Sequence, residues 1–364
     1  MFIITNRNIL KDKGNCSNVV GDICNQKGPA ELRLLEADKQ GDEWQVRVLP
    51  DTATDEMLAE LNIAKPKKGE DPVYASQYVF NKIIASAMAD PENLRHIVFF
   101  VHGFNNNLED VVNRCDSLAR TYGVEVVAFS WPSNGGGVRG VASYLDDKRD
   151  AQASVVAFDR ALDKARTLLQ KLRASAIAKI AKQSDKKFPD QGERFRELLT
   201  RKAEENCPLR TTLMLHSMGN YLLERTLKST ALRGHLPLFD NIAMCSADVN
   251  NPGHAQWVDE LQPRNRLYVT INEDDAALKA SRLKGSDEQL ARLGHWTSNL
   301  NSSQAIYVDF TNAESVGSSH AYFEGEALGN AKVKDFFTAA LQGLRAEQDV
   351  ALPYDVARNL YRVT

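Results

Sequence analysis

The chain has 364 residues, of which 43% are hydrophobic and 26% are charged, an ordinary composition for a globular protein with a substantial core. Its 45 basic and 48 acidic residues leave a formal net charge of −3, which gives no overall positive field for binding nucleic acid or anionic lipid. We expect no signal peptide, because the apolar run at the N-terminus meets polar residues at positions 6–8. We also expect no transmembrane segment, because no window is long enough to cross a bilayer.

The cysteines are odd in number, scattered and without CxxC spacing. They are Cys16, Cys24, Cys115, Cys207 and Cys245. We therefore expect plain thiols in a reducing, cytoplasmic setting. Cys115 and Cys245 stand in apolar stretches, where cysteine behaves as a small hydrophobic residue.

Three short runs open the chain, at residues 2–5, 31–37 and 44–49. The last two alternate polar and apolar residues around a turn, so we expect residues 1–50 to supply antiparallel strands at a sheet edge. A helical stripe follows over residues 75–88 and ends before a proline.

The pattern changes at residue 97. Residues 97–101 form an unbroken apolar run, which is typical of a central parallel strand covered on both faces. An amphipathic helix is predicted over residues 108–122, with Asn107 and Asp110 able to cap its start and Gly123 ending it.

Strands and helices continue to alternate after this helix. Further strands are predicted at 124–129, 212–215, 241–245, 266–271 and 304–310. The alternation predicts an α/β fold with a mostly parallel, doubly wound sheet and helices on both faces. The absence of a repeat or a linker favours one domain over residues 1–364.

One interval is too long for a single crossover. Residues 147–172 suffice for the connecting helix, so residues 174–206, interrupted near a proline at 189, are predicted to be a helical insertion. Their charge pattern leaves three interpretations open: a solvated surface extension, a lid over the active site, or a docking element for a membrane or a partner protein.

The strongest chemical signal is the segment 213–220, which leads directly into a helical stripe. A serine at a strand-to-helix turn holds its hydroxyl out of the sheet, where the N-terminus of the helix favours developing negative charge. We therefore interpret Ser217 as a nucleophile, with Gly219 letting the helix pack close to the strands. Leu215 departs from the G-x-S-x-G pattern, in which a small residue stands two positions before the serine.

A second signal lies at the end of the first buried strand, in residues 100–106. An acyl-transfer enzyme needs preorganised N–H donors for its oxyanion, and the loop after this strand is where one donor should lie. We assign that role to the backbone N–H of Phe104, and the second donor to the backbone N–H of Met218. We interpret His102 as a structural residue that braces the loop.

These segments together resemble the α/β-hydrolase superfamily and, within it, the bacterial hydrolase family DUF900, over about residues 95–325. The resemblance rests on 101–106, 129–133, 216–220, 247–250, Asp275 with 277–278, 292–294, and His320 with Tyr322. It implies a Ser-Asp-His hydrolase that uses no metal, and no cofactor is expected. It does not supply a substrate.

The triad partners should follow the serine, first the acid and then the histidine. The histidines available are His235, His254, His295 and His320. We favour His320, which stands in the loop after the last buried strand, and His295 is its rival. For the acid we favour Asp275, which matches the Asp-x-Ala-Leu pattern of the family. Asp274 and Asp248 remain alternatives.

These roles predict a serine hydrolase of the carboxylesterase or lipase-like kind, acting on a small-molecule or lipid acyl substrate through an acyl-enzyme intermediate. The aromatic residues near the predicted mouth either line an acyl pocket or pack in the core. They are Trp131, Trp296, Tyr322 and Phe323. Two alternatives stay open: an amidase or peptidase with the same triad, and an inactive binding or scaffold module, which the bulk of Leu215 favours. The sequence leaves the oligomeric state open.

Overall fold

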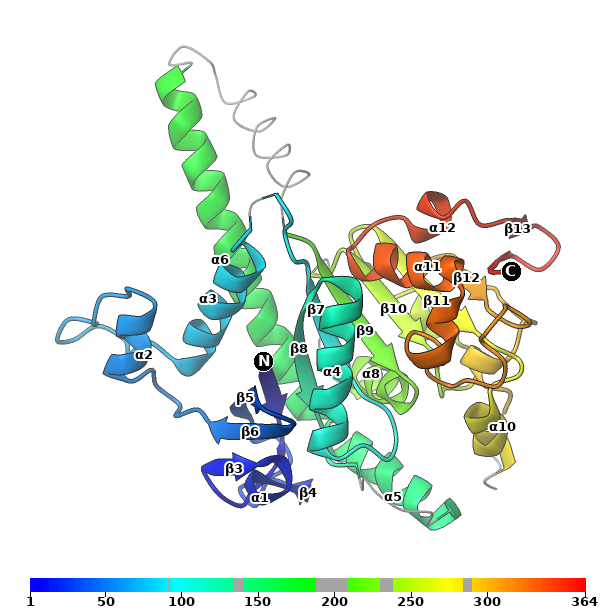
Figure 1. Cartoon of the computed structure of the whole chain (residues 1–364), viewed down its shortest axis with the longest axis horizontal. Helices are drawn as coiled ribbons and strands as arrows, with labels where there is room; N and C mark the ends of the chain where they lie inside the picture. Colours follow the sequence, from blue (N-terminus) through cyan, green and yellow to red (C-terminus); the bar gives the residue numbers. More distant parts are fainter. Residues whose placement is uncertain (91, 134–139, 188–208, 230–237, 284–289) are drawn as a thin grey trace.

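The computed structural model describes residues 1–90, 92–133, 140–187, 209–229, 238–283 and 290–364. Its centre is a twelve-stranded, mostly parallel sheet with helices on both faces (Figure 1). The parallel strands lie in the order β14 (Leu360–Arg362), β12 (Ala305–Asp309), β11 (Arg266–Ile271), β10 (Asn241–Cys245), β9 (Thr211–His216), β7 (Ile97–Val101), β8 (Glu125–Ser130) and β1 (Phe2–Thr5). The predicted α/β class and central strands are confirmed.

Antiparallel strands complete the sheet at its two edges. They are β5 (Arg33–Gln40), β6 (Glu43–Val48) and β3 (Lys13–Asn15) beyond β1, and β13 (Tyr354–Asp355) beyond β14. A separate two-stranded sheet pairs β2 (Arg7–Ile9) with β4 (Val20–Cys24). The expectation of edge strands fits β5 and β6, but β1 lies inside the sheet and runs parallel to β8. The apolar side chains of Phe2 and Ile3 account for the interior position of β1, because they are buried on opposite faces of the sheet.

Side-chain alternation divides the core between the two faces of the sheet. In β7, Phe99 and Val101 pack on one face, and Val98 and Phe100 pack on the other. The first face is covered by α3 (Ala75–Ala87), α6 (Val155–Lys187) and α8 (Met218–Ser229), and the second by α4 (Leu108–Tyr122) and α11 (Ala331–Leu341). The remaining elements are α1 (Cys16–Val19), α2 (Asp55–Glu60), α5 (Gly140–Ala153), α9 (Ala255–Val258), α10 (Ala276–Leu283), α12 (Ala346–Asp349), η1 (Leu293–His295) and η2 (Gly325–Gly329).

Helix α4 has the boundaries that its sequence predicts. Asn107 accepts a hydrogen bond from the Asp110 N–H at 2.9 Å, and Asp110 accepts one from the Asn107 N–H at 2.9 Å. Gly123 ends the helix at φ 63°, a left-handed conformation that glycine adopts without strain. The capping signals therefore fix where the chain leaves β7 and where it enters β8.

The order of the strands identifies one place where ligands are expected. The chain passes from β7 to β8 on one side and then returns to form β9 on the other side of β7. Such a reversal leaves a crevice at the carboxyl ends of the two strands, because their following loops diverge. Val101 pairs with Leu215 across this boundary, so the loop after β7 lies beside the turn after β9.

The long connection between β8 and β9 differs from the expected crossover of residues 147–172. It contains two helices, α5 and α6, which are separated at Ser154, and α6 runs unbroken to Lys187. Figure 1 shows α6 extending past the end of the sheet where the parallel strands begin. Residues 174–187 therefore lie away from the crevice, and residues 188–206 of the predicted insertion lie outside the described residues.

The cysteines that the structure describes carry free thiols. They are Cys16, Cys24, Cys115 and Cys245. Burial raises the pKa of Cys115 and of Cys245 to about 12, so both thiols stay protonated and pack as apolar groups. Cys207 lies outside the described residues.

Candidate active site

Ser217 stands alone between the end of β9 and the start of α8. Its φ of 54° lies in the left-handed region, which is strained for a residue with a side chain. Two hydrogen bonds hold this conformation: the Ser217 N–H donates to the Cys245 carbonyl at 3.0 Å, and the Asp248 N–H donates to the Ser217 carbonyl at 3.2 Å. This is the sharp strand-to-helix turn that exposes a hydroxyl at the end of a sheet.

Two glycines make room for the turn. A Cβ on Gly219 would lie 2.8 Å from the Val101 carbonyl oxygen, and one on Gly103 would lie 2.6 Å from the Ser217 Cβ. Leu215 is fully buried in the core beside β7, so its bulk lies in the packed sheet. The small residues that this turn needs are therefore Gly103 and Gly219, and Leu215 is no obstacle to it.

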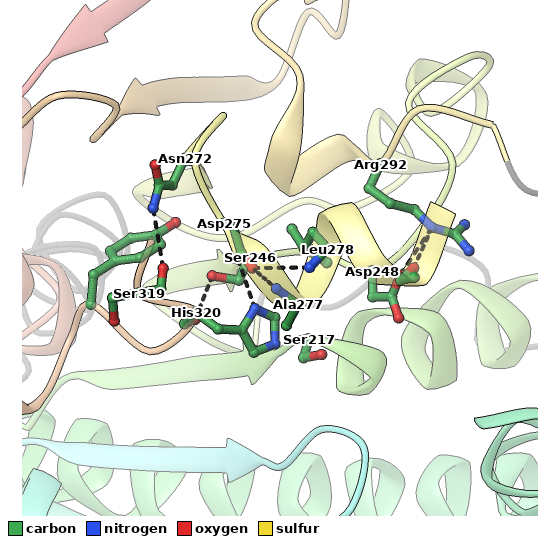
Figure 2. A network of polar contacts seen from close by, with 12 residues as sticks. Ser217, Ser246, Asp248, Asn272, Asp275, Ala277, Leu278, Arg292, Ser319 and His320 are labelled. Atoms are coloured by element: carbon green, nitrogen blue, oxygen red, sulfur yellow. Dashed lines mark hydrogen bonds and ion pairs between the residues drawn. The ribbon is translucent and has the colours of Figure 1, made fainter. Parts of the chain in front are cut away.

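His320 is bound to Asp275. The His320 Nδ1 lies 2.7 Å from Asp275 Oδ2, and the Asp275 side chain is fully buried (Figure 2). The other carboxylate oxygen of Asp275 accepts the backbone N–H groups of Ala277 and Leu278, each at 2.9 Å. Both oxygens are thus fixed, and the carboxylate holds the Nδ1 edge of the imidazole.

The two alternative acids are placed differently. Asp248 forms a buried ion pair with Arg292 at 3.0 Å and accepts hydrogen bonds from the Tyr144 and Ser281 hydroxyls at 2.9 and 2.7 Å. Asp274 is exposed. Among the residues that the structure describes, only Asp275 of the three candidates contacts a histidine ring.

The backbone of His320 is held by two side-chain donors. Its carbonyl oxygen accepts the His216 Nε2–H at 3.1 Å and the Ser246 hydroxyl at 2.7 Å. Burial and the nearby His320 ring lower the pKa of His216, so this donor is a neutral imidazole. His216, which precedes Ser217 in the sequence, therefore also fixes the loop that carries His320.

The other candidate histidines are accounted for separately. His254 contacts the Asn251 carbonyl at 2.6 Å and the Tyr307 hydroxyl at 2.5 Å, as a structural residue would. His295 is buried, and neither ring nitrogen has a hydrogen-bond partner among the described residues. His235 lies outside the described residues.

His102 braces the loop after β7, as the sequence predicts. Its Nε2 accepts the Trp131 N–H at 3.1 Å, and its Nδ1 lies 2.9 Å from the Gly103 carbonyl oxygen. Burial lowers the pKa of His102 to about 3, so the ring stays neutral.

Arg7 also fixes this loop, and sequence reasoning missed it. Its guanidinium is completely buried and donates to the Asn106 carbonyl at 2.6 Å and to the Ser130 hydroxyl at 3.0 Å. The Asn106 N–H in turn donates to the Ser133 hydroxyl at 2.8 Å. Burial lowers the pKa of Arg7 to about 10. A lone arginine between two asparagines resembles a surface residue, so no local signal could have found it.

A cavity of about 730 Å³ opens at the carboxyl ends of β7 and β9. Phe104, Ser217 and His320 line it together, and Met218, the first residue of α8, has a backbone N–H with no partner inside the helix. The Ser217 hydroxyl and the second ring nitrogen of His320 carry no hydrogen bond within the described part of the chain. Phe104, Ser217 and His320 therefore face one space.

Of the two interpretations of the aromatic residues, packing in the core fits three of the four. Trp131, Tyr322 and Phe323 are fully buried in the core, and Trp296, which is 37% exposed, stacks with Arg282. None of the four lines the described part of the cavity. Within the described residues, no group of three His, Cys, Asp or Glu side chains is placed to hold a metal ion.

The family model described as "Alpha/beta hydrolase of unknown function (DUF900)" matches residues 77–181 and 173–337, more than half of the chain. The chain belongs to this family. The suspected resemblance is confirmed, and so is the α/β-hydrolase fold of this DUF900 member.

The other two comparisons add little to what the family model shows. No curated protein matches this DUF900 member in sequence. Among solved structures, it is similar to "Phospholipase PlaB from Legionella pneumophila", with 10% identity, a TM-score of 0.21, and coverage of 63% of this chain and 42% of the phospholipase. The chain thus spans less than half the length of that protein. No described helix is both long and apolar enough to cross a membrane.

Proposed function

We propose that the chain is a serine hydrolase that cleaves carboxylic esters with Ser217, His320 and Asp275. The observation that carries this proposal is the 2.7 Å contact between His320 Nδ1 and the buried carboxylate of Asp275, at the cavity that Ser217 also lines. This contact fixes the imidazole so that its second nitrogen stays available to a proton donor.

The proposed reaction begins when the Ser217 hydroxyl attacks the ester carbonyl. His320 takes the hydroxyl proton, and Asp275 stabilises the imidazolium that forms. The alkoxide of the tetrahedral intermediate accepts hydrogen bonds from the backbone N–H groups of Phe104 and Met218. His320 then protonates the leaving alcohol, and water attacks the acyl-enzyme by the reverse sequence.

The close approach of Gly103 supports the place of the oxyanion donors. Because a Cβ on Gly103 would lie 3.2 Å from the Ser217 hydroxyl oxygen, the next residue, Phe104, lies beside the attacked carbonyl. Met218 follows the nucleophile directly, at the N-terminus of α8, where the helix dipole adds to the stabilisation of an anion. The alternative of an inactive module rested on Leu215, and the packing of Leu215 in the core removes that ground.

We further propose that residues 1–364 form one domain, since β1, β5 and β6 from the first fifty residues complete the same sheet as β7 and β9. The free thiols among the described cysteines support a reducing compartment such as the cytoplasm as its location.

The deciding experiment is intact mass after treatment with a fluorophosphonate probe. We expect one adduct on the native chain and none on Ser217→Ala or His320→Ala. Two matched controls should label normally: Ser303→Ala, an exposed serine, and His295→Gln, the rival histidine. An unlabelled native chain, or an adduct that survives in Ser217→Ala, would refute the assignment of the nucleophile.

A further inference from the structure

We propose that the ester cleaved at this site joins a short acyl group to a neutral, hydroxyl-rich alcohol such as a sugar or another polyol. The inference rests on the proposed serine hydrolysis and adds the class of substrate. The evidence is the difference between the polar groups of the cavity that already bind other protein groups and those that are left for a ligand.

The wall formed by the loop after β7 and by α4 is polar. Asn105, Asn107, Asn113 and Ser117 lie along it. Two of these amides are partly used by the fold: Asn107 accepts the Asp110 N–H, and Asn113 accepts the Trp44 indole N–H at 2.8 Å. Burying a hydrocarbon chain against this wall would strip water from amides and return no hydrogen bonds.

Asn105 carries a buried, unsatisfied polar atom on this wall. Its backbone is held at φ 58°, with its N–H donating to Asp147 at 3.1 Å. Its side-chain oxygen is buried and has no partner among the described residues. An unpaired buried amide costs free energy, and an alcohol hydroxyl, which both donates and accepts, would satisfy a carboxamide whichever end faces it.

The charges on the wall favour a neutral alcohol. Arg114 is the arginine of the described lining, and Glu324 binds it through two nitrogens, at 3.0 and 2.8 Å. Asp248 is likewise neutralised by Arg292. An anionic group such as a phosphate would therefore have to compete with Glu324 for its cation, beside the carboxylate of Asp110.

A second part of the cavity lining suits a short acyl group. It is formed by the start of α10, where Ala277, Leu278 and Ala280 line the cavity, and Figure 2 shows the first two next to Asp275. Two of the three are alanines, which leave space for a few carbons. A longer chain would also meet polar groups of the lining, such as the hydroxyls of Ser281 and Tyr144.

The test compares two pairs of substrates. Glucose 6-acetate and cyclohexylmethyl acetate share an acetyl group and a six-membered ring but differ in ring hydroxyls, and p-nitrophenyl acetate and octanoate differ in acyl length. We expect kcat/KM to be at least about tenfold higher for the sugar ester, because a site built for hydroxyls rejects the analogue that lacks them. We also expect acetate to be preferred to octanoate.

Asn105→Gly keeps a residue that tolerates the left-handed backbone and removes the amide. We expect its kcat/KM to fall about tenfold for glucose 6-acetate and less than twofold for cyclohexylmethyl acetate. The matched control is Asn312→Gly, an exposed asparagine at φ 61° outside the cavity, which should leave both values unchanged.

The outcomes distinguish a failure of the proposed substrate class from a failure of the proposed serine hydrolysis. A chain that takes up the fluorophosphonate on Ser217 yet prefers cyclohexylmethyl acetate or octanoate remains a serine hydrolase and overturns the hydroxyl-rich substrate. A chain with neither adduct nor turnover overturns both. Equal losses on both acetates in Asn105→Gly would show that Asn105 only supports the loop, and would overturn its role in binding the alcohol.

Discussion

The carboxylate of Asp248 lies 3.0 Å from the guanidinium of Arg292, and each side chain is only 3% exposed. Removing one partner of a buried ion pair leaves the other charge uncompensated and costs about 3–5 kcal/mol. We predict that Asp248→Asn lowers the free energy of unfolding by about that amount, as measured by urea denaturation. Its folded fraction should still label with the fluorophosphonate.

Asp275→Asn should have the opposite effect, with a small change in stability and a large loss of turnover. The asparagine keeps an oxygen for the N–H groups of Ala277 and Leu278, so stability should change by about 1 kcal/mol. It cannot act as a negative partner of His320, and kcat for p-nitrophenyl acetate should fall about a thousandfold or more. If Asp248→Asn abolished turnover in the folded protein and Asp275→Asn did not, the acid would be misassigned.

Gly103→Ala should disable the site through a single methyl group. The new Cβ would lie 2.6 Å from the Ser217 Cβ, closer than real contacts allow, so the loop and Ser217 must separate. We predict a loss of about a hundredfold or more in kcat, the cost of losing one oxyanion donor. The control is Gly329→Ala, whose Cβ would meet Ser315 at an ordinary 3.4 Å. Equal turnover in the two variants would contradict the prediction.

His216 is predicted to position His320 without touching the substrate's reacting atoms. His216→Phe keeps a ring and removes the donor to the His320 carbonyl, so kcat should fall about fivefold with little change in KM. His216→Gln places an N–H where Nε2 stood and should recover most of the loss. If the variants lost stability but their folded fraction kept the native kcat, His216 would act only in packing.

The neutral His102 should make the fold sensitive to acid. Its pKa is about 3 in the folded state and about 6.5 when unfolded, so between these values only the unfolded chain binds the proton. Stability should therefore fall as the pH drops, by about 2 kcal/mol from this group between pH 7 and pH 5. His102→Gln should flatten the plot of unfolding free energy against pH. Parallel profiles for the two proteins would rule the mechanism out.

Much of the fold could be read from the sequence because its signals are local. The five apolar residues of β7 and the Asn107, Asp110 and Gly123 caps of α4 lie within the segments that they define. The short strands β2, β4 and β13 were missed, because each has two to five residues and is stabilised by a partner elsewhere in the chain.

The candidate site divides in the same way. Ser217 and Phe104 follow from strand-end motifs. The choice between Asp275 and Asp248 as the acid instead depends on tertiary contacts, because Arg292 from a different loop pairs with Asp248 while Asp275 contacts His320. Arg7 could not have been found, since its burial results wholly from tertiary contacts. The choice between pocket and core for the aromatic residues stayed open because sequence alone does not distinguish a core ring from a pocket wall.

The pairing of Val101 with Leu215 also determines which changes of chain length the site can survive. Deleting one residue within β9 would draw Ser217 back by about 3.3 Å and turn every later side chain of the strand to the opposite face. The same deletion before β9 would alter only the connection. Relatives built on this sheet should therefore vary in length between strands, while the distance from β9 to the candidate nucleophile stays constant.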